Sequence, residues 1–148
     1  MKWFLLALWP TVICLSPKTQ APVAALTIEI KGVQAPLGVM RVALYDSAQH
    51  FLDFKAVAAS KVIPSSLEIT TVVLDSLPSG TYAVALYQDQ NNNGAMDKNW
   101  IGIPKEPLGF SMASLRTFGP PSFQDCAFKL EAGAHKTITI PLENNQSK

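Results

Sequence analysis

Residues 81–89 read Thr81-Tyr82-Ala83-Val84-Ala85-Leu86-Tyr87-Gln88-Asp89, and this stretch decides the fold class. Its β-branched and aromatic residues recur with a period of two, the spacing of side chains on one face of a strand. In a strand, Tyr82, Val84 and Leu86 share one face, and Ala83, Ala85 and Tyr87 share the other. A similar alternation occurs at residues 39–45, and no long 3.6-residue period appears anywhere. The sequence therefore predicts a β protein.

Turn signals rich in Gly, Pro, Ser and Asn separate the candidate strands. The segment 51–63 is ambiguous, because residues 55–61 can also form a short helix. About seven short strands in one domain predict an all-β fold, an immunoglobulin-like or transthyretin-like antiparallel β-sandwich over residues 26–143. Residues 144–148 are expected to form a disordered tail. The predicted strands are residues 26–31, 39–45, 51–63, 67–74, 81–89, 126–130 and 136–142.

The first 25 residues have the features of a secretory signal peptide. Lys2 supplies a positive start, residues 3–15 form an apolar run, and Val23-Ala24-Ala25 places small residues before a cleavage site. The run is shorter than the roughly twenty residues that a membrane-spanning helix needs. We therefore expect export to the periplasm or the exterior, with cleavage after Ala25 and no integral membrane span afterwards. A retained membrane anchor and a lipoprotein acylated at Cys14 are the alternatives.

The charge balance argues against a nucleic-acid partner. Without residues 1–25 the chain keeps ten basic and eleven acidic residues, and the basic ones are scattered singly. Nucleic-acid binding needs clustered Lys and Arg side chains that neutralise phosphates. We expect instead a protein or glycan partner at the cell envelope.

Motifs of known catalytic sites are absent from the sequence. His50 and His135 are the only histidines, both fall at expected turns, and no serine-hydrolase, zinc-peptidase or phosphate-loop motif occurs. Cys126 is expected to share a strand face with Phe128 and Leu130, which predicts a buried, unreactive thiol. The chain is therefore predicted not to be an enzyme.

Residues 89–97 match the first nine positions of a calcium-binding loop of the form D-x-N-x-N-G-x-x-D. Side-chain oxygens at positions 1, 3, 5 and 9 can converge on one Ca²⁺ ion, and position 7 contributes its carbonyl oxygen. Position 12 normally carries a bidentate Glu but is Trp100 here, so a more distant acid would have to replace it. The alternative is an Asx-rich turn whose Asn side chains bond their own backbone. The predicted Ca²⁺ ligands are Asp89, Asn91, Asn93, Ala95, Asp97 and Glu106.

The segment 89–123 is longer than most loops of a small domain, and such loops are often functional. Aromatic side chains in it can cover the apolar faces of sugars or peptides. Residues 100–123 therefore suggest a small-ligand or glycan/peptide-binding module, as an alternative to a calcium-stabilised structural or interaction module. A hydrolase that uses Glu106 with a second carboxylate is the least supported hypothesis. The aromatic residues of this segment are Trp100, Phe110, Phe118 and Phe123.

Several sequence blocks in one order resemble the bacterial domain-of-unknown-function family 2141. They are Pro78-x-Gly80-x-Tyr82-Ala83-Val84, the loop 89–97, Gly102-Ile103-Pro104-Lys105-Glu106, Gly109-Phe110-Ser111 and Phe118-Gly119-Pro120-Pro121-x-Phe123-x-Asp125. The resemblance covers roughly residues 26–142 and implies an exported β-sandwich domain of unassigned function. The loop 89–97 is also similar to the cation loops of Gram-positive adhesin sandwich repeats.

Overall fold

Strand β5 (Gly80–Asp89) lies at the centre of the fold and pairs with several other strands. The computed structural model describes residues 22–116 and 119–144 of the chain. In it β5 pairs antiparallel with β2 (Val39–Tyr45), β6 (Leu108–Phe110) and β7 (Phe128–Leu130). Every residue of β5 from Tyr82 onward is buried. The strand predicted over residues 81–89 is therefore confirmed.

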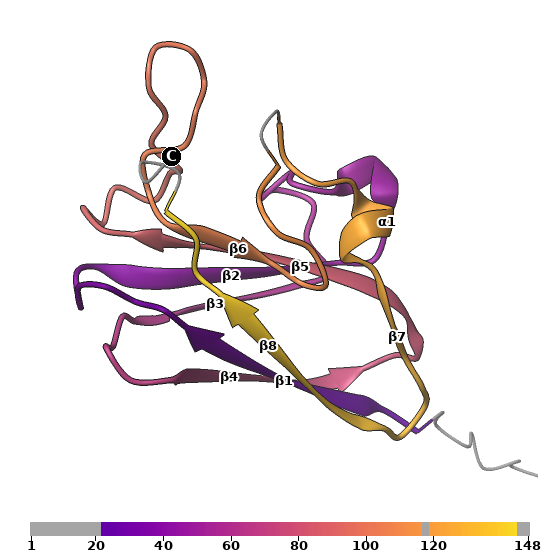
Figure 1. Ribbon diagram of the computed structural model, residues 1–148. Helices are drawn as coiled ribbons and strands as arrows, with labels where there is room; N and C mark the ends of the chain where they lie inside the picture. The colour runs from indigo at the N-terminus through magenta and orange to yellow at the C-terminus, as the bar shows by residue number, and fades with distance from the viewer. Residues whose placement is uncertain (1–21, 117–118, 145–148) are drawn as a thin grey trace, which may run out of the picture.

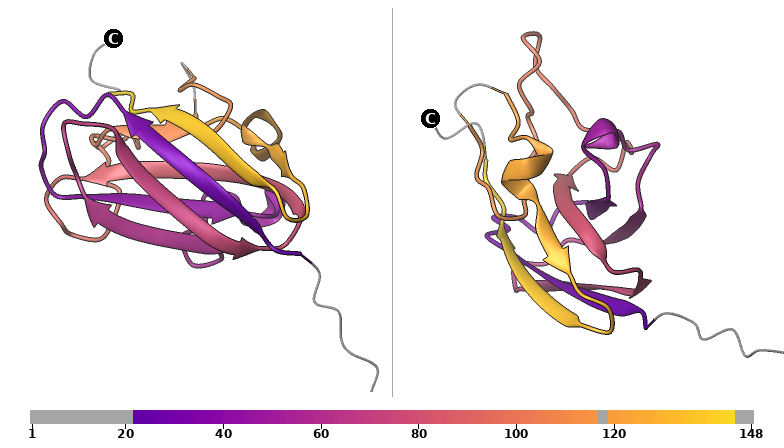
Figure 2. Two further views of the ribbon diagram at one scale, coloured as in Figure 1. Left: turned by 90° about the horizontal axis from the view of Figure 1, so that it is seen from below. Right: turned by 90° about the vertical axis from the view of Figure 1, so that its right-hand side faces the viewer.

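Two sheets pack face to face as a β-sandwich (Figure 1). The larger sheet has the order β3-β2-β5-β6, with β3 (Ala59–Pro64) at one edge and β7 paired to β5. The smaller sheet has the order β4-β1-β8, formed by β1 (Ala24–Lys31), β4 (Thr70–Leu77) and β8 (His135–Pro141). Figure 2 shows β8 beside β1, and this pair is parallel, whereas the other strand pairs are antiparallel. The predicted all-β sandwich is confirmed.

The strands of the larger sheet have apolar side chains on both faces. Tyr82, Val84 and Leu86 point into the core between the sheets, together with the alternate residues of β2. Ala85 and Tyr87 belong to a second apolar cluster on the outer face of the same sheet. The division of β5 into two faces, predicted from its period of two, is correct. The buried members of the second cluster are Ala43, Tyr45, Ala83, Ala85, Tyr87, Leu108, Phe110 and Cys126.

Loops form a third layer over the outer face of the larger sheet (Figures 1 and 2). They include the 3₁₀ helix η1 (Ala48–His50) and the short helix α1 (Phe123–Cys126). Aromatic rings connect these loops to the sheet in edge-to-face contacts, a favourable geometry for ring pairs. The ring centroids of successive members of the series Phe123, Phe51, Tyr45, Phe54 and Tyr87 lie 5.8, 5.3, 6.5 and 5.5 Å apart. The outer face is thus a second, smaller core.

The strand predicted over residues 51–63 is mostly wrong. Only Ala59–Pro64 pairs with β2, and residues 51–58 form turns across the outer face. The apolar side chains of Phe51, Leu52 and Val57 pack against the second cluster, which replaces strand pairing as the way to bury them. Leu52 has a φ of 69°, a left-handed conformation that a strand does not contain, and residues 55–61 form turns and the start of β3 rather than the alternative helix.

Three other boundaries also differ from the prediction. The strand expected over residues 67–74 lies at Thr70–Leu77 instead, and the short strand β6 lies inside the segment 89–123 that was expected to be one loop. Cys126 is the last residue of α1 rather than part of a strand, and β7 begins at Phe128. A capping box starts α1, because the side chains of Ser122 and Asp125 each accept the other's backbone N–H. The thiol is nevertheless buried, as predicted.

Strand β1 begins at Ala24, next to the expected cleavage site. The pairing of β1 with β4 is irregular between Ala24 and Leu26, and its regular register begins at Leu26. Most of the predicted signal peptide (residues 1–21) and most of the predicted tail (residues 145–148) lie outside the described residues. Within residues 22–116 and 119–144, no helix is long and apolar enough to cross a membrane.

Candidate functional site

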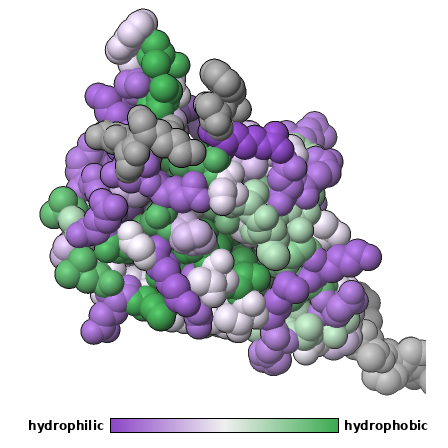
Figure 3. Space-filling model, in the orientation of Figure 1, coloured by the Kyte–Doolittle hydropathy of each residue, from purple (hydrophilic) through white to green (hydrophobic). Residues whose placement is uncertain are grey.

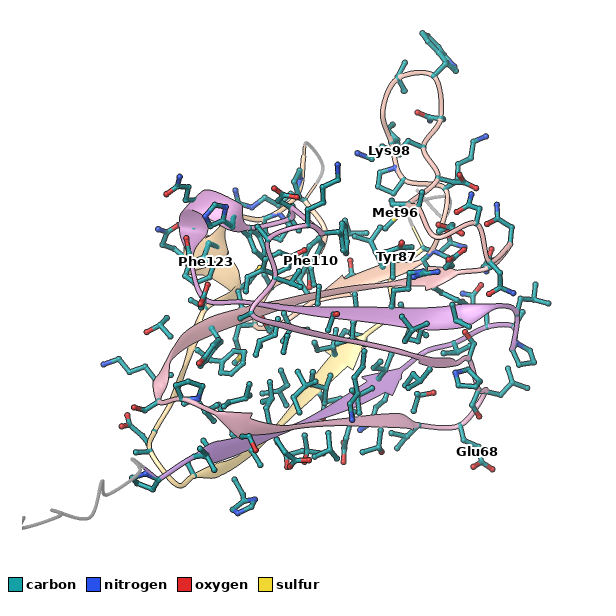
Figure 4. All side chains as sticks on the ribbon, turned by 180° about the vertical axis from the view of Figure 1, so that it is seen from behind. Glu68, Tyr87, Met96, Lys98, Phe110 and Phe123 are labelled. Carbon is teal, nitrogen blue, oxygen red and sulfur yellow. The ribbon has the colours of Figure 1, made fainter. Side chains whose placement is uncertain are left out.

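A groove runs over the outer face of the larger sheet, between the loops that cover it. It has two adjoining parts, with cavity volumes of about 540 Å³ and about 260 Å³. Both parts are lined by Leu52, Phe54, Tyr87, Met96 and Lys98, so the two form one continuous surface. We call them together the outer groove. In Figure 4, the labelled Tyr87, Met96 and Lys98 follow one another from the sheet towards the protruding loop.

The two parts of the outer groove differ in chemistry. The larger part, which we call the basic part, is lined by Arg41, Lys61 and Lys98. The smaller part, which we call the apolar part, is lined mainly by hydrophobic side chains, among them Phe110 and Leu115. Neither Asp nor Glu occurs among the described residues that line either part. Three cationic residues, Arg41, Lys61 and Lys98, line the basic part, and the mainly hydrophobic lining of the apolar part includes the shared Lys98 and Arg116.

The aromatic residues expected to bind a ligand lie in different places. Phe110 of β6 is buried and lines the apolar part of the outer groove. Phe123 of α1 contacts Phe51 in the aromatic series instead. Trp100 is 94% exposed and lines neither part of the groove. Phe118 lies outside the described residues. Of the predicted aromatic surface, only Phe110 reaches the groove within the part of the chain that the structure describes.

Asp89 ends β5 and its side chain is completely buried. Its Oδ2 accepts hydrogen bonds from Arg41 Nε at 2.6 Å and from Gly94 N at 2.9 Å, and its Oδ1 accepts from Asn93 N at 3.0 Å. Burial alone raises the pKa of this carboxyl group, but the hydrogen bonds from Arg41, Gly94 and Asn93 outweigh burial and lower the pKa below 3.8. Asp89 is therefore a buried carboxylate whose charge Arg41 neutralises.

The Asn residues of the loop join its backbone to Asp97. Asn91 Oδ1 accepts from Asn93 N at 3.1 Å, and Asn93 Oδ1 accepts from Ala95 N at 2.8 Å. The side-chain amide of Asn91 donates to Asp97 Oδ2 at 2.7 Å, and that of Asn93 donates to Asp97 Oδ1 at 3.0 Å. The structure thus brings Asn91, Asn93 and Asp97 together, in the Asx-turn arrangement expected as the alternative to a cation site.

Glu106 closes the loop from the opposite side. It is 4% exposed, and its Oε1 accepts from Gln90 N at 2.9 Å while its Oε2 accepts from Asp97 N at 3.2 Å. Both carboxylate oxygens therefore bind backbone amides at the two ends of the segment 90–97. Glu106 does not line the outer groove, where a hydrolase would need its acid.

The contacts of the loop bear directly on the predicted Ca²⁺ ligands. The carboxylate oxygens of Asp89, Asp97 and Glu106 all accept hydrogen bonds from the loop's own N–H groups or from Arg41. In residues 22–116 and 119–144, no three His, Cys, Asp or Glu side chains gather closely enough to hold a metal ion. Asp89, the first expected ligand, would have to exchange Arg41 for the ion. Calcium binding by this loop stays a prediction.

Sequence reasoning missed the basic residues of the outer groove. Arg41 carried a usable signal, because it is the only charged residue in the apolar strand β2, and a charge in such a strand needs a partner. Nothing in the sequence indicated Lys61 and Lys98, because they lie on separate segments that come together only in the folded chain.

Two of the sequence blocks have structural roles. The hydroxyl of Tyr82 donates to Pro78 O at 3.0 Å and fixes the turn between β4 and β5. Ser111 is buried just after β6, where its Oγ accepts from Val84 N at 2.8 Å and donates to Cys126 O at 2.6 Å. Ser111 thereby joins β5 to α1 beneath the covering loops.

A family model described as "Uncharacterized protein conserved in bacteria (DUF2141)" matches residues 28–139. The match extends from β1 to β8 and includes both sheets, the Asp/Asn loop and the residues beneath the outer groove. Comparison with curated proteins and with solved structures found no match. Because the family model covers most of the chain, the chain belongs to the bacterial DUF2141 family of uncharacterized proteins.

Proposed function

We propose that the chain is an exported, non-catalytic module that binds a small amphipathic anion in the outer groove. The observation that carries this proposal is the chemistry of the groove lining. Arg41, Lys61 and Lys98 line the basic part, hydrophobic side chains line the apolar part, and no carboxylate lies among the described lining residues of either. A ligand with one negative group and an apolar body matches this distribution.

The two parts of the groove suggest how such a ligand lies. Its negative group meets Lys61, Lys98 and the guanidinium of Arg41, whose Nε–H is bound to Asp89 but which has further N–H donors. Its apolar body extends past Tyr87 and Met96 into the apolar part. The larger volume, about 540 Å³, falls within the roughly 300–1,000 Å³ common for small-molecule sites.

A direct test compares dodecanoate with dodecanol by isothermal titration calorimetry, below the critical micelle concentration of dodecanoate and below the solubility limit of dodecanol. The two molecules share an apolar chain and differ in charge. A charge-assisted hydrogen bond contributes about 1.5–3 kcal/mol, so we expect dodecanoate to bind at least about tenfold more tightly. If neither molecule binds, the groove does not hold an apolar chain and the proposal is wrong.

Charge reversal at one lining residue tests whether the anion binds in the basic part of the groove. Lys61→Glu places a carboxylate in the basic part and should weaken dodecanoate binding about tenfold or more, with little effect on dodecanol. Lys129→Glu is the matched control, because Lys129 is an exposed lysine on β7 that does not line the groove. Equal losses in the two variants would mean that total charge, rather than the groove, controls binding.

Export is the second element of the proposal. It is supported by the basic start, apolar run and small-residue cleavage site within residues 1–25. We expect the intact mass of the exported protein to correspond to a chain that begins at Leu26. A full-length mass, or one with an acyl group on Cys14, would contradict this.

A second candidate function is a calcium-stabilised structural or interaction module at the cell envelope. It rests on the match of residues 89–97 to the first nine positions of a calcium-binding loop. Because the ion would compete with Arg41 for Asp89, we expect weak binding, with a Kd on the order of 10⁻⁴–10⁻³ M. The competition between Arg41 and Ca²⁺ provides its test, because Ca²⁺ should raise the melting temperature more in Arg41→Met than in the wild type.

A further inference from the structure

The loop of residues 98–105 stands away from the sandwich (Figure 1), and hydrophobic residues lie on the part that protrudes (Figure 3). Trp100 is 94% exposed, Ile101 is 55% exposed and Ile103 is 39% exposed. A tryptophan normally buries most of its large apolar surface, so an almost fully exposed one needs an explanation. Since Trp100 lines neither part of the outer groove, ligand binding there does not supply one.

Hydrogen bonds hold the apex in one conformation. Gly102 N donates to Asn99 O at 3.0 Å, and Asn99 N donates to Ile103 O at 2.8 Å. The side-chain oxygen of Asn99 also accepts from Ile101 N at 3.1 Å and from Ile103 N at 2.9 Å. Below these contacts, Lys98 and Pro104 form an antiparallel bridge. Trp100 is therefore exposed at the apex of a turn that hydrogen bonds hold closed.

The charged side chains within the loop are both lysines, and of the two flanking acids Asp97 accepts hydrogen bonds from Asn91 and Asn93 while Glu106 is buried. Lys98 and Lys105 are both exposed and stand at its two sides, and residues 98–105 contain no Asp or Glu. An apolar apex above a pair of lysines matches a phospholipid surface, which offers an apolar interior beneath negatively charged headgroups.

We propose that the loop 98–105 docks the protein onto an anionic phospholipid surface. Trp100 and Ile101 enter the interface between headgroups and acyl chains, where tryptophan is enriched, and the two lysines face the lipid phosphates. A protein partner fits the loop less well, because a stable interface buries about 800 Å² on each side and the apex offers only a few side chains. A membrane needs no surface complementary in shape to the turn.

Tryptophan fluorescence of the full chain tests the proposal. The chain has three tryptophans, so a Trp3→Phe, Trp9→Phe background leaves Trp100 as the only one. The probe is a vesicle of equal parts phosphatidylcholine and phosphatidylglycerol, with pure phosphatidylcholine vesicles for comparison. We expect the Trp100 emission to move to shorter wavelength with the anionic vesicles and to be quenched by brominated acyl chains, with a smaller change on neutral vesicles. Emission that stays unchanged with both vesicles overturns the proposal, even if residues 1–25 carry the protein to the lipid.

Vesicle sedimentation of variants identifies the residues responsible. Ile101→Ser should weaken binding to the anionic vesicles several-fold, and Lys105→Gln should weaken it about fivefold, the effect of one charge near a lipid surface. Leu67→Ser is the control, since Leu67 is also exposed but lies next to Glu68, far from this loop in Figure 4. Equal affinity of the wild type, Ile101→Ser and Lys105→Gln contradicts docking by this loop. None of these variants changes a residue that lines the outer groove, so failure here leaves the groove proposal intact.

Discussion

Arg41 Nε donates a 2.6 Å hydrogen bond to Asp89 Oδ2 and so joins neighbouring strands on the outer face of the larger sheet. The pair is diagonal, because Arg41 lies opposite Tyr87 in the register and Asp89 lies opposite Val39. The Arg41 side chain is 30% exposed, whereas that of Asp89 is fully buried. Loss of Arg41 would leave a buried negative charge without its cation, so the fold depends on this pair more than on an ion pair at the surface.

We predict that Arg41→Met lowers the free energy of unfolding by about 3 kcal/mol, the lower end of the range for breaking a buried pair, because Arg41 is partly exposed. Urea denaturation of both proteins measures the difference. Arg116→Met is the matched control, since Arg116 and Asp125 form an exposed pair at 2.6 Å whose loss should cost less than about 1 kcal/mol. Equal losses in the two variants would contradict the importance of the Asp89 contact.

The stability of the protein should depend on pH through Asp89. Its pKa in the folded chain is lower than 3.8, so its ionised form contributes stability that is fully present above the pKa of the unfolded chain. This contribution is lost as the pH falls through the lower pKa of the folded chain. We expect the difference in unfolding free energy between wild type and Asp89→Asn to shrink between about pH 6 and pH 3. A difference that stays constant over this range would show that Asp89 has the same pKa in both states.

Calcium should compete with Arg41 for Asp89. At a tenfold excess over Kd, Ca²⁺ stabilises the folded chain by about 1.4 kcal/mol, which raises the melting temperature by roughly 5 °C. We expect a larger rise in Arg41→Met, where no guanidinium has to be displaced from Asp89. Asp97→Ala should remove the effect, whereas Asp125→Ala, outside the loop, should keep it. If neither the wild type nor Arg41→Met melts at a higher temperature in calcium than in chelator, the calcium function is excluded.

The thiol of Cys126 should be unreactive in the folded protein. Cys126 is fully buried, and burial together with the neighbouring Asp125 raises the pKa of its thiol to about 11. In a Cys14→Ser background, a thiol reagent at about pH 8 should label the native protein slowly and the denatured protein at once. An exposed cysteine introduced by Ser114→Cys supplies the fast control. Rapid native labelling of Cys126 would show that the end of α1 opens readily.

The sequence predicted the strands that alternate regularly and failed where a buried side chain belongs to no strand. In β5, the period of two at Tyr82, Val84 and Leu86 identified the strand and both of its faces. Phe51 and Leu52 looked like strand residues by composition, yet they pack over the outer face from turns. An apolar residue type indicates that a side chain will be buried. Only the tertiary arrangement decides whether the segment that carries it is a strand or a turn.

The candidate site was harder to predict because its residues are not neighbours in the sequence. The Asp/Asn loop is a local motif, so the clustering of Asn91, Asn93 and Asp97 could be anticipated. The partner of Asp89 could not, since Arg41 lies 48 residues earlier in the chain. The outer groove likewise depends on loops that meet over the sheet only after folding.

The parallel pairing of β1 with β8 means that the smaller sheet is completed by a strand from the far end of the domain's sequence. Thr139 Oγ1 of β8 donates to Glu29 Oε2 of β1 at 3.2 Å, although the two residues are 110 positions apart. Until residues 135–141 have left the ribosome, β1 has only β4 beside it, and a two-stranded ribbon is at best marginally stable in water. Closing so long a loop is also slow. We therefore expect the smaller sheet to become stable only when β8 is available to pair with β1, late in the folding of the domain.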